Sequence, residues 1–131
     1  MSDADDGTED RFAIPRRPQR RYPHSGGVEY DGETVFTLVP TPDRSTESLQ
    51  SLVERALSAD RYTFGDWFDL PMPLYLVNDE LTGDVFRVSV RDGTVRFHVL
   101  PATESAGLRG LFERLRAVES ELTWQVDCHV E

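Results

Sequence analysis

The residues best suited to chemistry are two histidines and an aspartate in the last third of the chain. His98, Asp127 and His129 could form an acid/base site or bind a metal ion, because imidazole and carboxylate groups carry protons and ligate metals. Their spacing matches no diagnostic metal or catalytic motif. The two histidines come close to each other only if the strands that carry them are neighbours in a sheet.

A second candidate site is a cationic group formed by Arg87, Arg91, Arg96 and His98. Guanidinium groups bind carboxylates and phosphates through paired hydrogen bonds. This group could therefore recognise an anionic ligand or an acidic protein. Alternatively, the same side chains pair with acidic neighbours on a solvated sheet face, where exposed ion pairs contribute little to stability.

The cationic group lies within residues 84–101, which read as a β-hairpin. Asp92 and Gly93 separate two alternating runs and predict a two-residue type I′ turn, since both central positions of that turn need positive φ. The turn places the three arginines, Ser89 and His98 on one polar face. The opposite face is apolar and predicts a contribution to the core from Phe86, Val88, Val90, Val95, Phe97 and Val99.

Two amphipathic helices flank this hairpin. The first begins near the possible N-caps Asp43, Ser45 and Thr46, and its apolar side chains recur at helical spacing through Asp60. The second begins at Thr103 or Ser105 and ends near Val118. Its two glycines, at 107 and 110, share one side and would let another backbone approach closely. The aromatic-rich segment 61–71 lacks a clean period and reads as a connection with one helical turn near residues 66–68.

Further strands are predicted at residues 33–39, 74–77 and 123–130, and a short strand at 28–30 would form a second hairpin around Asp31 and Gly32. Similar features recur about sixty residues apart: an Asp-Gly turn, a phenylalanine, a proline and a helix containing Glu-Arg. This order indicates a duplicated β-β-α-β unit. The predicted fold is therefore an α+β two-layer sandwich, with a mixed, mostly antiparallel sheet of five to six strands and both helices packed on one face.

The other sheet face, which no helix covers, is the predicted binding face. It combines Arg87, Arg91, Arg96 and His98 with Val35 and Val39, which alternation places on the same side. Exposed aliphatic side chains beside a cationic group are typical of an interface.

The N-terminal segment differs in composition from the rest. Residues 1–27 contain five acidic residues, five arginines and three prolines, which predicts a disordered tail. Its Arg- and Pro-rich half could be a linear motif or simply a solvated segment. Residues 28–131 are predicted to form a single α+β domain.

The charge pattern is unusual. The formal net charge is −10, and all 14 basic residues are arginine. Such an acidic, lysine-free composition resembles that of proteins from extremely halophilic archaea, in which the acidity reflects a salt-filled cytoplasm and carries no functional motif. It makes nucleic acid an unlikely partner, because a duplex binder needs a basic surface.

Several further classes are excluded by what the sequence lacks. It shows no signal peptide or spanning segment, so we expect a cytoplasmic protein without membrane contact. Its single cysteine, Cys128, allows no internal disulfide and falls on the apolar phase of the last strand, which predicts a buried side chain. No cofactor motif is present, so we expect no cofactor.

These observations predict a non-catalytic protein-interaction or regulatory module that uses the helix-free face, with a homodimer or another protein as the partner. The alternatives are a metal-binding or acid/base site at His98, Asp127 and His129, and a nucleic-acid site formed by the arginines.

Overall fold

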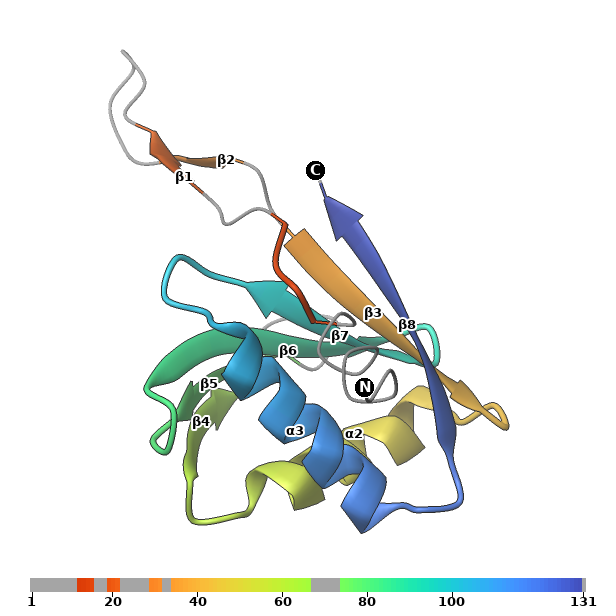
Figure 1. The fold of residues 1–131 in the computed structure, drawn as a ribbon. Helices are drawn as coiled ribbons and strands as arrows, with labels where there is room; N and C mark the ends of the chain where they lie inside the picture. Colours follow the sequence, from red (N-terminus) through yellow and green to blue (C-terminus); the bar gives the residue numbers. More distant parts are fainter. Residues whose placement is uncertain (1–11, 16–18, 22–28, 32–33, 67–73, 131) are drawn as a thin grey trace, which may run out of the picture.

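A computed structural model describes residues 12–15, 19–21, 29–31, 34–66 and 74–130 (Figure 1). The order of its main sheet is β4-β5-β6-β7-β3-β8, with every neighbouring pair antiparallel. The strands of this sheet are β3 (Thr34–Thr41), β4 (Tyr62–Asp66), β5 (Leu74–Asp79), β6 (Asp84–Arg91), β7 (Thr94–Val99) and β8 (Thr123–Val130).

The two helices of the described chain, α2 (Thr46–Leu57) and α3 (Ser105–Val118), lie side by side on one face of this sheet (Figure 1). The connections β3-α2-β4 and β7-α3-β8 each join strands that run in the same direction, so both helices cover the same face. The predicted α+β sandwich with both helices on one side is therefore confirmed, and its sheet is antiparallel throughout.

The β6–β7 hairpin has the predicted turn and register. Asp92 and Gly93 have φ values of 53° and 71°, as a type I′ turn requires. Phe86 pairs with Val99, and the pairing continues without a slip to Arg91 and Thr94. All six predicted core residues of the hairpin are at most 1 % exposed.

The core fills the space between the sheet and the two helices. The apolar stripe predicted for α2 is buried against the sheet together with that of α3. Ser45 is the N-cap of α2, and its hydroxyl accepts a hydrogen bond from the Ser48 N–H. Glu104 occupies the N-cap position of α3 and makes no side-chain capping bond. The prediction that Thr103 or Ser105 caps this helix is therefore wrong. Thr103 instead donates to the carbonyl of Val85.

Phe12 adds an unexpected ring to the core. It is fully buried and packs against Phe36, Phe97 and Phe112 with ring centroids 5.3–5.8 Å apart. Its carbonyl accepts a hydrogen bond from the Ser105 hydroxyl. The domain boundary at residue 28 stays a prediction, but this residue of the predicted tail belongs to the core.

Two local predictions are corrected. The segment β2 (Glu29–Asp31) pairs with β1 (Gln19–Arg21) in a separate two-stranded sheet, where the sequence predicted a hairpin with the strand that became β3. Residues 62–66 form β4 at one border of the main sheet, where a connection was predicted. Trp67 and Phe68 of the predicted helical turn lie outside the described residues. The duplication of a β-β-α-β unit remains a prediction.

Neither helix in the described ranges has the length and apolar character needed to cross a bilayer.

Candidate functional site

The strand order fixes the layout of the helix-free face, which we define as the outward side chains of β3, β6, β7 and β8. One row across the sheet contains Arg87, His98, Val35 and His129, in that order. The next row contains Ser89, Arg96, Thr37 and Asp127. Cationic side chains of β6 and β7 therefore lie beside the aliphatic and hydroxyl side chains of β3, followed by the mixed charges of β8.

The two histidines are not brought together. Strand β3 lies between β7 and β8, so Val35 pairs with His98 on one side and with His129 on the other. Two strand spacings separate the histidine backbones by about 10 Å. In the described ranges, no group of three His, Cys, Asp or Glu side chains is placed to hold a metal ion. The juxtaposition on which the acid/base and metal alternatives depend is therefore absent.

Ser89 and His98 form a hydrogen bond that the sequence did not reveal. Ser89 Oγ lies 2.8 Å from His98 Nε2, across a diagonal of the β6–β7 hairpin. A histidine beside a serine can activate it as a nucleophile. Ser89 is only 2 % exposed, however, so a substrate could not reach its hydroxyl without rearrangement of the surface. The contact stabilises the hairpin and orients the imidazole.

The remaining candidate residues differ in their surroundings. Arg91 is exposed at the turn and lies 3.6 Å from the exposed carboxylate of Asp92. Arg96 Nε donates to Thr94 Oγ1 at 3.4 Å. On β8, the Gln125 amide donates to both carboxylate oxygens of Asp127.

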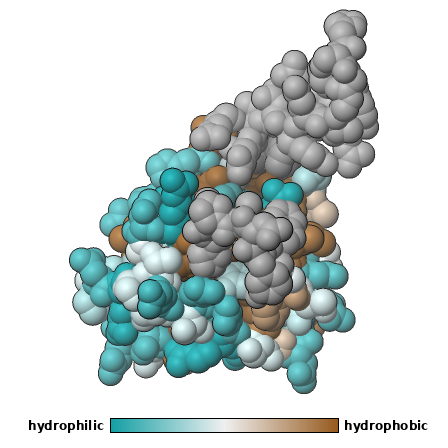
Figure 2. Space-filling model, turned by 180° about the vertical axis from the view of Figure 1, so that it is seen from behind, coloured by the Kyte–Doolittle hydropathy of each residue, from teal (hydrophilic) through white to brown (hydrophobic). Residues whose placement is uncertain are grey.

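Val35 and Val39 are partly exposed on this face. Figure 2 views the molecule from the side opposite to Figure 1, and hydrophobic surface appears there in several places among hydrophilic residues. The described residues of the helix-free face therefore mix aliphatic and charged groups.

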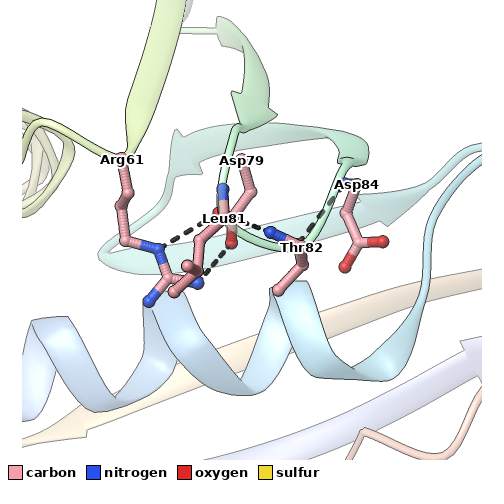
Figure 3. A network of polar contacts seen from close by, with 5 residues as sticks. All are labelled: Arg61, Asp79, Leu81, Thr82 and Asp84. Carbon is pink, nitrogen blue, oxygen red and sulfur yellow. Dashed lines mark hydrogen bonds and ion pairs between the residues drawn. The ribbon is translucent and has the colours of Figure 1, made fainter.

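A second polar cluster lies on the helix side of the sheet and was missed by sequence reasoning (Figure 3). Arg61, just before β4, forms a two-point ion pair with Asp79 at the end of β5. Its Nε lies 3.1 Å from Oδ1 and its Nη2 lies 2.6 Å from Oδ2. The Asp79 side chain is fully buried and also accepts from the Leu81 and Thr82 N–H groups. Burial alone would raise the pKa of Asp79, but these hydrogen bonds and the guanidinium charge outweigh it and hold that pKa below its usual value.

Asp84, at the start of β6, has the opposite balance. It is 2 % exposed, and burial raises its pKa. Among the described residues, its Oδ2 atom has no hydrogen-bond partner. The carboxylate lies against Gly107 in the first turn of α3, a helix whose own N-cap side chain makes no capping bond.

The two glycines of α3 make room for this cluster. A Cβ at Gly107 would lie 2.1 Å from Asp84 Oδ2, and a Cβ at Gly110 would lie 2.9 Å from Arg61 Nη2. Another segment approaches this side of the helix closely, as predicted. The groups that approach are the charged side chains of Asp84 and Arg61, whereas the sequence predicted the approach of a backbone. Buried Tyr62 adjoins the cluster: burial raises its pKa to about 12, and Arg61 lies over its ring at 5.2 Å.

This cluster anchors the β4–β5 border and the β5–β6 turn onto α3. The Asp79 carboxylate is directed at the Arg61 guanidinium and at the Leu81 and Thr82 N–H groups, which is the arrangement expected of a structural network. The sequence signals were the acidic turn 78–84 and the glycine pair, but neither identifies its partner without the strand order.

A hollow of about 530 Å³ lies between the end of α3 and the start of β8. Arg116 and Trp124 are among its lining residues. Among the described residues, the Trp124 Nε1–H has no hydrogen-bond partner, and the atom is shielded from solvent. A ligand in the hollow could not reach this donor without movement of the indole.

The prediction that the Cys128 side chain is buried is wrong, because it is exposed near the end of β8. It occupies the core-facing phase of the strand, opposite Phe36, but this end of β8 extends beyond the cover of the helices.

A scan of the chain against protein-family models finds no match, and comparisons with curated proteins and with solved structures find none either.

Proposed function

We propose that this protein is a non-catalytic interaction module that binds a protein partner on its helix-free face. One observation carries the proposal: Arg87, Arg96 and His98 of β6 and β7 lie on the same face as Val35 of β3, and His98 is the direct neighbour of Val35. On a chain with a net charge of −10, this local concentration of cationic side chains stands out from the surroundings.

The side chains on this face define the chemistry of the partner. Guanidinium groups favour carboxylates, which they can bind through two parallel hydrogen bonds. The partly exposed valines of β3 favour aliphatic side chains at the same interface. The best match is a protein segment in which acidic and aliphatic residues alternate, since this spacing follows the period of the strands beneath it.

The acid/base and metal alternatives gain no support from the strand order, because β3 separates the histidines. The buried Ser89 hydroxyl is likewise poorly placed for covalent catalysis. Binding of nucleic acid through the same arginines remains an outcome that an experiment can distinguish.

The test is a titration with a short peptide of alternating aspartate and valine, followed by amide chemical shifts and calorimetry. An asparagine-valine peptide and a single-stranded RNA serve as comparison probes. We expect the acidic peptide to bind and to shift resonances of β3, β6 and β7. The Arg96→Ala variant should weaken binding about fivefold, the equivalent of roughly 1 kcal/mol for one exposed charge-assisted contact.

The matched control is Arg109→Ala, because Arg109 is a partly buried arginine on α3, on the other side of the sheet. It should leave peptide binding unchanged. Equal loss in both variants, or equal binding of the acidic and neutral peptides, would contradict the proposal. Tighter binding of RNA than of peptide would favour the nucleic-acid alternative instead. All titrations are run with KCl at a low level and at about 2 M, since screening weakens exposed ion pairs.

A further inference from the structure

The outer edge of β8 is the second feature that points to a partner. Strand β8 is eight residues long and pairs with β3 along its whole length, from Thr123 opposite Thr41 to Val130 opposite Thr34. No strand in the described ranges pairs with its other edge, and β8 forms a border of the sheet in Figure 1. Alternate backbone N–H and C=O groups on that edge are therefore directed away from the sheet.

This edge lacks the usual features that prevent strand pairing. Natural edge strands are kept short, carry lysine or proline, or contain a bulge. The ladder between β3 and β8 runs through eight consecutive pairs without a bulge, and β8 contains neither proline nor a basic side chain other than His129. Val130 is 47 % exposed near its end. The opposite border differs, because β4 has five residues and includes Gly65.

We propose that β8 pairs in antiparallel fashion with β8 of a second copy of this chain, about a two-fold axis at Cys128. In this register, Asp127 of each copy lies opposite His129 of the other, so the interface contains two pairs of acidic and imidazole side chains. Val126 lies opposite Val130 on the helix side of the sheet. Opposite charges and aliphatic pairs at directly facing positions both stabilise antiparallel strands.

Charge distinguishes this register from its neighbours. An axis at Asp127 would place two aspartates directly opposite each other, which is unfavourable. An axis at Val126 would place Asp127 opposite Gln125, a side chain that already donates to Asp127 within its own strand. Of these three axes, only the one at Cys128 places the Asp127 carboxylate of each copy opposite the His129 imidazole of the other.

The axis is perpendicular to the sheet, so the two sheets join into one and keep their helices on the same side. The helix-free faces of the two copies then become continuous, with His129 and Asp127 at the junction. This inference does not rest on the proposed binding function of that face, because it uses the edge of β8 and not the arginines of β6 and β7.

The first experiment measures molar mass by light scattering with the Cys128→Ser chain at concentrations up to about 1 mM, so that association with a Kd of that size is detected. We expect a concentration-dependent rise from the 14.9 kDa of a single chain toward twice that mass. The Asp127→Arg change should weaken association about tenfold, since both copies lose a pair and gain a repulsion. The double variant Asp127→Arg/His129→Asp should restore it. A strict monomer, or a dimer insensitive to Asp127→Arg, would overturn the proposal.

The second experiment tests the register by oxidation with diamide at alkaline pH, because burial raises the pKa of the Cys128 thiol and the thiolate is the reactive form. Directly opposite residues in an antiparallel pair have Cα atoms about 4.5–5.5 Å apart, within the range of a disulfide. We expect rapid formation of a Cys128–Cys128 dimer on a non-reducing gel. In the Cys128→Ser background, new cysteines at Val126 and at the exposed turn residue Leu81 provide controls for register and for random collision. Cross-linking at position 126 that is faster than at 128, or equal rates at 81 and 128, would overturn the proposed axis.

These results are separable from the proposed binding function. Arg96→Ala should reduce peptide binding and leave the dimer intact, whereas Asp127→Arg should weaken the dimer and leave the β6–β7 part of the face unchanged.

Discussion

The two glycines of α3 allow a matched test of the cluster between the sheet and this helix. Both lie in the same helix, so replacing either with alanine should gain about 1 kcal/mol of helix propensity. Their surroundings differ. A Cβ at position 107 would meet Asp84 Oδ2 at 2.1 Å and the Asp84 Cβ at 2.8 Å, close to its backbone. A Cβ at position 110 would meet only the guanidinium of Arg61, at 2.9 Å for the nearest atom.

The magnitudes follow from which neighbour can move. Asp84 is held at the start of β6, so Gly107→Ala should overpack the site at a cost of about 2–3 kcal/mol, which exceeds the propensity gain. The net result is a loss of about 1–2 kcal/mol in the free energy of unfolding. The end of the Arg61 side chain can shift slightly, so Gly110→Ala should be neutral or stabilising by up to about 1 kcal/mol.

The assay is urea denaturation of both variants, followed by far-UV circular dichroism in identical KCl. Backgrounds that lack the neighbour provide the control: Gly107→Ala within Asp84→Gly, and Gly110→Ala within Arg61→Ala, should each recover the full gain of about 1 kcal/mol. The reasoning would be refuted if Gly107→Ala were as stable as the original chain, or if the two single variants differed by less than about 0.5 kcal/mol.

Three further predictions concern the core and the buried charges. Phe12→Ala should lower the free energy of unfolding by about 3–5 kcal/mol, as expected for the truncation of a core residue. Phe64 is more exposed, so Phe64→Ala should cost less in the same denaturation assay. A loss below about 1 kcal/mol in Phe12→Ala would place Phe12 outside the core. Arg61→Ala should cost about 3 kcal/mol at neutral pH, because it leaves the buried Asp79 carboxylate unpaired. Folding lowers the pKa of Asp79, so this carboxylate should stabilise the fold fully above the ordinary carboxyl pKa. Its stabilisation should be lost as the pH falls through the pKa of Asp79 in the folded protein. The free energy of unfolding, measured against pH, should therefore fall less on acidification in Arg61→Ala. One tyrosine should titrate near pH 12 by ultraviolet absorbance, and this titration should be missing in Tyr62→Phe. The variant should keep its stability, because the Tyr62 hydroxyl has no hydrogen-bond partner among the described residues. A titration unchanged by the substitution would contradict the assignment.

Local sequence determined much of the fold. The Asp92-Gly93 turn has a backbone geometry that few other dipeptides adopt easily, so it fixes the register of β6 and β7. Alternation along each strand then decides which side chains enter the core, and helical spacing does the same for α2 and α3. The two crossovers explain why both helices cover one face.

Long-range pairing was less accessible from the sequence. Nothing in the alternation of β3 or β8 states that β3 lies between β7 and β8, yet this choice separates His98 from His129. The pairing of β2 with β1 was missed because the Asp31-Gly32 signal favoured a different partner. Phe12 was missed because one aromatic residue in a charged, Pro-rich segment has no periodicity to mark it as buried.

The candidate site was predicted in part. The cationic residues of β6 and β7 share one face as expected, because the hairpin register alone places them there. The Arg61–Asp79 pair and the position of Asp84 against Gly107 were not predicted, since they join a turn, a strand end and a helix that only the tertiary structure brings together.

The position of β3 also bears on how the chain folds. Strands β4 to β7 are neighbours both along the chain and in the sheet, so their contacts close early and at low entropic cost. The pairing of β3 with β8 joins Thr34 to Val130, near the two ends of the sheet's sequence, and requires closure of a much longer loop. We therefore expect the meander to form first and the β3–β8 ladder to complete the sheet last. The border strand that carries His129 and Cys128 would then be the last to acquire its neighbour, and until that moment both of its edges would be open to other chains.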